Sequence, residues 1–230
     1  MKHAVVHAPA FSALRLDFEL GEAILAQPGS MQAMTPGFDV EVRMGMQMSG
    51  RRGLLGGMRS MFGGESLFTV LYRSKREAQH LMLAPEQMGE IRMVEVAADA
   101  GLVLARGAFL AATPSLSLAL QYGGIHGMLA TRGLFFLRTE GAGTLFMSSY
   151  GGLVEQQLGP DERFVVDNRN IVCFSQGMTF ESVMLTKSLK SSFFSGEGFT
   201  VRFNGPGRLI WQTRARPTIG WLRGLLQTVT

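Results

Sequence analysis

Few residues of this chain combine into a pattern with a known chemistry. The four histidines, His3, His7, His80 and His126, include no two that lie two residues apart, the spacing of a cupin-type metal site. The single cysteine, Cys173, lies in an apolar run and is predicted to be a small buried hydrophobic residue. No Gly-Lys pair is present for a Walker A phosphate loop, and no Gly-x-Ser-x-Gly nucleophile elbow occurs. We therefore expect no metal, no cofactor and no catalytic residue.

Acidic residues, in contrast, recur at matching places in the two halves of the chain. Glu22 matches Glu162, and Glu65 matches Glu197. Paired carboxylates could serve in acid–base catalysis if they converged on one site. A duplicated segment also explains the pairs, because a carboxylate at the start of a strand often accepts backbone N–H bonds within its own turn. We favour the structural interpretation.

Basic residues concentrate in the last fifth of the chain. Residues 181–230 contain seven of the 22 lysines and arginines and two of the 18 acidic residues. Such a surface could contact RNA or an anionic lipid. Alternating polarity points Phe203 inward and leaves few aromatic residues for base stacking, so nucleic acid is an unlikely partner. The candidate basic rim consists of Arg202, Arg208, Arg214 and Arg216.

A second candidate surface is the segment Gly45–Gly63, which has six glycines, four methionines, three arginines and no acidic residue. Long loops on a rigid β scaffold often carry function, and methionine-rich surfaces adapt to different partners. We expect this loop to contact another subunit or to be partly disordered, with a membrane surface or a ligand as alternatives. Its candidate contact residues are Arg51, Arg52, Met58, Arg59, Met61 and Phe62.

The elements that position these residues are predicted to be strands. Turn signals recur every 8–12 residues between β-branched, aromatic or methionine-rich runs, which is typical of an all-β sandwich or barrel. Three hairpins of similar design are predicted at residues 67–84, 133–147 and 199–213. Helix is expected only as a turn near Met58–Phe62 and in a segment after Pro217.

The second half of the chain also repeats the first. Residues 22–44 and 162–184 run in step at a constant offset of 140. We predict a single globular unit, 1–230, built of two β repeats at about 1–105 and about 130–216, with a C-terminal tail at 217–230. The side chains predicted to pack inward are Ile24, Phe68, Val70, Phe164, Phe199, Val201 and Trp211.

Composition describes a folded chain, with 46% hydrophobic and 17% charged residues. Its apolar runs are too short to span a bilayer, and the first residues show no secretory signal. A lone cysteine cannot form an internal disulfide. We expect a protein of the bacterial cytoplasm, with association at a membrane surface left open.

Five segments also follow one another in a characteristic order, Gly21–Met31, Gly53–Phe68, Gly107–Ala112, Gly141–Met147 and Gly205–Thr213. As an ordered set across residues 10–216, they resemble an uncharacterised bacterial family related to the mitochondrial biogenesis protein called altered inheritance of mitochondria. The resemblance implies a double-stranded β-helix similar in fold to the tryptophan RNA-binding attenuation protein, present in two tandem copies. It also implies a homo-oligomer, as a trimer or a multiple of it, and supplies no catalytic residues.

Two functions follow from these observations. The first is a non-enzymatic, oligomeric structural or interaction protein whose main partner is itself, acting near membranes. The second is a binding module for a small molecule or an anionic polymer, either RNA or a lipid surface. A polar cavity would favour the small molecule, and strongly salt-dependent binding would favour the polymer.

Overall fold

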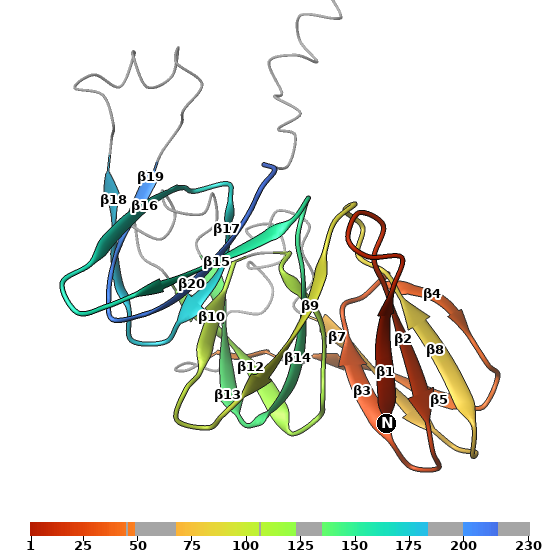
Figure 1. Ribbon diagram of the computed structural model, residues 1–230. Helices are drawn as coiled ribbons and strands as arrows, with labels where there is room; N and C mark the ends of the chain where they lie inside the picture. The colour runs from red at the N-terminus through yellow and green to blue at the C-terminus, as the bar shows by residue number, and fades with distance from the viewer. Residues whose placement is uncertain (45, 49–67, 106, 123–134, 184–199, 216–230) are drawn as a thin grey trace, which may run out of the picture.

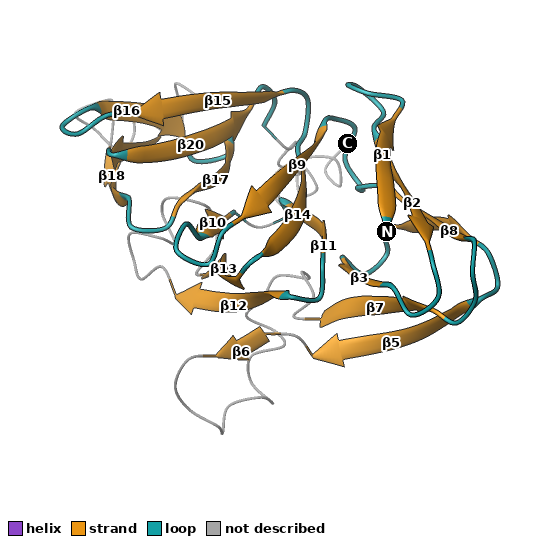
Figure 2. Ribbon diagram, turned by 60° about the horizontal axis from the view of Figure 1, so that its bottom comes forward, coloured by secondary structure: helices purple, strands orange, loops and turns teal. Residues whose placement is uncertain are grey.

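The computed structural model describes the chain except for residues 45, 49–67, 106, 123–134, 184–199 and 216–230. The described residues form strands and turns without a helix, and the strands lie in four sheets (Figures 1 and 2). The all-β prediction is confirmed. The two predicted helical segments and the predicted tail, 217–230, lie outside the described residues.

The same arrangement of six strands occurs three times along the chain. In each unit the first, sixth and third strands form one antiparallel sheet with the sixth in the centre. The fourth, fifth and second strands form another antiparallel sheet with the fifth in the centre. The strands of unit 1 are β2 (Ala13–Phe18), β3 (Ala23–Ala26), β4 (Met31–Met34), β5 (Phe38–Met44), β7 (Phe68–Ser74) and β8 (Gln79–Leu83).

Units 2 and 3 follow the same order. Unit 2 contains β9 (Ile91–Val96), β10 (Leu102–Leu104), β11 (Phe109–Ala112), β12 (Leu116–Tyr122), β13 (Phe135–Gly141) and β14 (Gly143–Ser148). Unit 3 contains β15 (Leu153–Leu158), β16 (Arg163–Asp167), β17 (Ile171–Ser175), β18 (Thr179–Val183), β19 (Thr200–Asn204) and β20 (Gly207–Gln212). Two further strands lie outside the six-strand pattern. β1 (Lys2–Val6) precedes unit 1 and pairs with β2, and β6 (Met46–Met48) lies between β5 and β7 in the chain and pairs in parallel with β12.

Strand register coincides among the units as well as strand order. In unit 1 Leu25 pairs with Leu71, and the equivalent pairs are Val103 with Arg138 and Val165 with Arg202. A register irregularity also occurs at one equivalent place in every unit: between Met31 and Ala33, between Phe109 and Ala111, and between Ile171 and Cys173. The two segments matched by sequence belong to units 1 and 3, and unit 2 lies between them.

The three predicted hairpins are wrong, although their strands are in place. β7 and β8 follow one another across a short turn but belong to different sheets, and the same is true of β13 and β14 and of β19 and β20. At these turns the chain crosses from one sheet to the next. In unit 2 the corner is at Gly141, whose φ of 87° is accessible to glycine at little cost. Alternating polarity predicts which side chains are buried, but it does not choose the hydrogen-bonding neighbour.

Consecutive units are joined by strand pairing, and we call each such pair a junction. β3 of unit 1 pairs with β11 of unit 2, and β10 of unit 2 pairs with β17 of unit 3. The Gln27 amide donates to the Leu110 carbonyl at 2.8 Å, and the equivalent Ala105 amide donates to the Val172 carbonyl at 2.8 Å. One sheet of each unit thus continues into a sheet of the next.

The apolar side chains form three clusters along the chain. Of the side chains predicted to pack inward, Ile24, Val70 and Val201 are buried. Phe164 and Trp211 are partly buried against the cluster of unit 3. The side chain of Phe68 is half-buried, and Phe199 lies outside the described residues.

Candidate interaction surface

The contact loop predicted from the sequence falls on residues that the structure does not describe. This applies to Arg51, Arg52, Met58, Arg59, Met61 and Phe62, and also to Arg216 of the basic rim. Arg202, Arg208 and Arg214 of the rim are described.

Two arginines of the basic rim are paired with acidic side chains. On β19, Arg202 contacts Glu181 of β18, with its Nε 2.9 Å and its Nη2 2.8 Å from Oε1. On β20, Arg208 Nη1 lies 3.9 Å from Oε1 of Glu155 on β15. Arg214 follows β20 and is exposed. Positive charge at this rim is therefore partly neutralised by neighbouring strands.

The exposed face of the β16–β19–β18 sheet carries an open pocket of about 350 Å³. Both signs of charge occur in it, and Asn204 Nδ2 donates to Thr179 Oγ1 at 3.2 Å. Within the described part of the chain, no three His, Cys, Asp or Glu side chains cluster in a way that could hold a metal ion. The pocket lining is Asp161, Arg163, Thr179, Glu181, Arg202, Asn204 and Gly205.

The matched glutamates that the structure describes are used in turns. Glu22 Oε2 accepts the Glu19 amide at 2.9 Å, and Glu162 Oε2 accepts the Gly159 amide at 2.7 Å. Contact with the Met1 ammonium, and then the Glu19 amide, lowers the pKa of Glu22. Each carboxylate binds the turn of its own unit, as the structural interpretation predicts. Glu65 and Glu197 lie outside the described residues.

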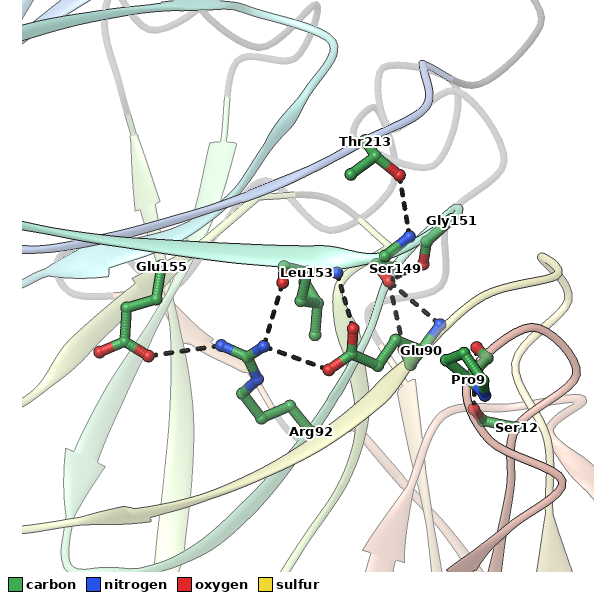
Figure 3. A network of polar contacts seen from close by, with 10 residues as sticks. Pro9, Ser12, Glu90, Arg92, Ser149, Gly151, Leu153, Glu155 and Thr213 are labelled. Atoms are coloured by element: carbon green, nitrogen blue, oxygen red, sulfur yellow. Dashed lines mark hydrogen bonds and ion pairs between the residues drawn. The ribbon is translucent and has the colours of Figure 1, made fainter.

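A cluster of charged residues that the sequence analysis missed joins β9 to β15 (Figure 3). Arg92 Nη2 lies 3.1 Å from Glu90 Oε1, and Arg92 Nη1 lies 3.3 Å from Glu155 Oε2. The same Nη2 donates to the Leu153 carbonyl at 3.1 Å, while Glu90 Oε2 accepts the Leu153 amide at 2.8 Å. These contacts hold units 2 and 3 together. No sequence signal indicated the contacts between the strands, because Leu153 and Glu155 lie 61 and 63 residues from Arg92 in the chain.

Cys173 lies in β17 and has no exposed surface. Burial raises the pKa of its thiol to about 12. A thiol of this kind stays protonated at neutral pH and is a poor nucleophile. The prediction that Cys173 is a buried hydrophobic residue is confirmed.

Two strand edges, β4 and β16, carry exposed apolar side chains. All four residues of β4 are exposed, whereas the equivalent β11 is completely buried and β17 nearly so. Met31 and Met34 of β4 are 40% and 42% exposed. Val165 of β16 is 44% exposed. Exposed apolar strand edges are sites at which another chain can pair.

Comparison with known proteins places these features in a family. The family model for mitochondrial biogenesis AIM24 matches residues 3–214. The chain belongs to this family. The resemblance predicted from the ordered segments is therefore confirmed.

Relatives of the family are similar along their whole length. An uncharacterised protein of Streptococcus pyogenes serotype M6 is 29% identical over 216 residues, covering 93% of this chain and 86% of that protein. An X-ray crystal structure of another S. pyogenes protein superposes with a TM-score of 0.73 at 27% identity, covering 100% of this chain and 99% of the other. Neither description gives an activity.

Among the described residues, no helix has the length and apolarity needed to cross a membrane.

Proposed function

We propose that this protein is a non-enzymatic interaction protein that works as a homo-oligomer, a closed trimer or a multiple of it. The observation that carries the proposal is a pair of strand edges. All of β4 is exposed, whereas the equivalent β11 and β17 are buried, and Val165 of β16 is exposed, whereas Val103 of the equivalent β10 is buried. Exposed edges of this kind favour association; β4 has no charged residue or proline, and β16 has charged residues only at its two ends, Arg163 and Asp167. Its principal partner is another copy of itself.

The proposal includes a tandem origin for the fold. The sequence offset supports two copies of one β unit, and the coincident registers support a third copy, unit 2, between them. Two three-stranded sheets in each unit, crossed by corner turns, support a double-stranded β-helix similar in fold to the tryptophan RNA-binding attenuation protein. Similarity of fold does not bring RNA binding with it.

The hydrogen bonds and ion pairs of the glutamates support a role without catalysis. Glu22 and Glu162 bind turn amides, and Glu90 and Glu155 are both paired with Arg92. Carboxylates engaged in this way stabilise turns and strand contacts. We place the protein in the bacterial cytoplasm, with the loop Gly45–Gly63 as its contact with a membrane surface or a neighbouring subunit.

The pocket on the β16–β19–β18 sheet favours a second function, the binding of a small molecule or an anionic polymer. Arg163 and Arg202 supply positive charge there, and Asp161 and Glu181 oppose it. Binding of RNA or of anionic vesicles that falls steeply with added salt would support this alternative.

Light scattering at micromolar concentration tests the main proposal. The expected mass is a multiple of 25.1 kDa. A monomer of that mass would overturn it. Deleting Gly50–Arg59 should leave the β fold intact, as judged by circular dichroism, and alter assembly or the binding of anionic vesicles.

A further inference from the structure

The two junctions inside the chain have the same geometry. At the first, Ala26 and Leu25 of β3 pair with Ala111 and Ala112 of β11. At the second, Leu104 and Val103 of β10 pair with Cys173 and Phe174 of β17, which are the equivalent positions. Each junction joins the second strand of one unit to the third strand of the next.

Each end of the chain carries half of a further junction. β16, the second strand of unit 3, pairs only with β19 in the described part of the chain. β4, the third strand of unit 1, pairs in the same described part only with β8. These are the two strands whose equivalents form the junctions. They lie at opposite ends of the molecule in Figure 1, so they cannot meet within one chain.

We propose that β16 of one molecule pairs with β4 of a second copy and continues the sheet in the register of the internal junctions. This inference rests on the proposed oligomer and names its contact. By equivalence, Val166 pairs with Ala33 of the next copy, and Val165 pairs with its Met34. The Asp167 amide then donates to the Gln32 carbonyl, as Gln27 does to Leu110 and Ala105 does to Val172.

The exposed side chains fit this contact. Val165 and Met34 are directly opposite one another in the proposed register, and both are apolar and more than 40% exposed in the isolated chain. Pairing would cover them and satisfy the backbone groups at both edges. The contact joins two different surfaces, so each copy keeps one free edge for the next. Repetition then gives a closed ring or an open filament, according to the rotation between copies.

A double variant, Met34→Cys with Val165→Cys, tests the contact by oxidation. Residues directly opposite in an antiparallel pair have Cα atoms about 4.5–5.5 Å apart, within the range of a disulfide. We expect a ladder of disulfide-linked species under mild oxidation, resolved on a non-reducing gel. The native Cys173 is buried with a pKa of about 12 and does not compete.

Three controls make the result specific. Met34→Cys alone and Val165→Cys alone should give no linked species, since the contact is between different edges. Met34→Cys with Val42→Cys should also give none, because Val42 is an exposed residue of β5, outside the proposed contact. Linkage by a single variant would show an edge pairing with its own copy and overturn the proposal.

A charge on the edge provides a second measurement. Val165→Lys should raise the protein concentration at which the oligomer dissociates by about tenfold or more, since a charged edge blocks pairing. Val42→Lys should leave that concentration unchanged. An oligomer that forms without linkage of the double variant, or that tolerates Val165→Lys, overturns the β16–β4 contact and leaves the proposed function standing. A monomeric wild type overturns both.

Discussion

Glu22 and Glu162 show how one side chain can stabilise a turn. Each carboxylate accepts a hydrogen bond from the backbone amide three residues earlier, Glu19 or Gly159. The backbone amide of the glutamate in turn donates to the carbonyl of that same earlier residue. These bonds are local in sequence, so the place of each glutamate at the start of a strand was sufficient to predict them. Ala100 occupies the equivalent turn of unit 2 and keeps the backbone bond to Ala97 without the carboxylate.

Replacing Glu22 with Gln should lower the free energy of unfolding by about 1 kcal/mol at pH 7, because one oxygen no longer accepts a hydrogen bond. The pKa of Glu22 is lowered in the folded state. Its contribution is therefore present above the unfolded pKa of about 4.3 and is lost as pH falls through the folded pKa. Urea unfolding at pH 7 and pH 3 measures this change. Glu41→Gln, at an exposed pair with Arg43, serves as the control. An effect of equal size at both pH values would contradict the assignment.

Gly89 is a glycine because of backbone proximity. A Cβ at this position would lie 2.2 Å from the Ser149 carbonyl oxygen and 2.7 Å from that of Gly151. Gly89→Ala should therefore destabilise the fold by about 1–3 kcal/mol, seen as a lower melting temperature. Gly152→Ala is the matched control, since its Cβ would have nothing nearer than 3.7 Å. Equal melting temperatures for the two variants would show that units 2 and 3 adjust freely at this point.

Among the strands, location was predicted better than partnership. The sequence analysis placed strands at β7, β8, β13, β14, β19 and β20 but joined them as hairpins. A short glycine turn is compatible both with a hairpin and with a corner between sheets, and both geometries bury the same alternate residues. The deciding interactions are pairings such as β3 with β7 and β8 with β2, which come from distant parts of the chain.

Between β9 and β15, Arg92 makes contacts with both strands. Its partners are about a quarter to two-fifths exposed, so the cluster is shielded only in part from solvent. Arg92→Met should lower the free energy of unfolding by about 1–3 kcal/mol, because Glu90 and the Leu153 carbonyl lose a charged donor. Arg15→Met, at a 3.8 Å exposed pair, should change it by less than about 0.5 kcal/mol. Guanidinium unfolding followed by tryptophan fluorescence compares the two. Similar values would show that the cluster is ordinary surface charge.

For the molecule as a whole, the sequence indicated repetition but resolved only its outer members. Units 1 and 3 share Glu22 and Glu162 and a constant offset, whereas Ala100 interrupts this pattern in unit 2. The candidate surfaces were less predictable. Whether a strand edge is exposed depends on whether another strand pairs with it. β11 and β17, the equivalents of β4, each have a second neighbouring strand and are buried. Sequence patterns describe the strand, while topology determines its exposure.

Assembly through apolar edges should depend weakly on salt. Backbone hydrogen bonds and the burial of Met34 and Val165 would carry the proposed contact, and neither is screened by ions. We expect the mass measured by light scattering to be the same at 0.05 and about 0.5 M NaCl. Dissociation at the higher concentration would point to the rim arginines as the site of association.

The three units differ in length mainly in the connection between their fourth and fifth strands. The connection between the fourth and fifth strands runs from Met44 to Phe68, from Tyr122 to Phe135 and from Val183 to Thr200, while the first four strands keep constant spacing. An engineered insertion, such as a peptide tag or a small fluorescent domain, is therefore best grafted between Tyr122 and Phe135. The equivalent connections of units 1 and 3 offer two further graft points on the same chain.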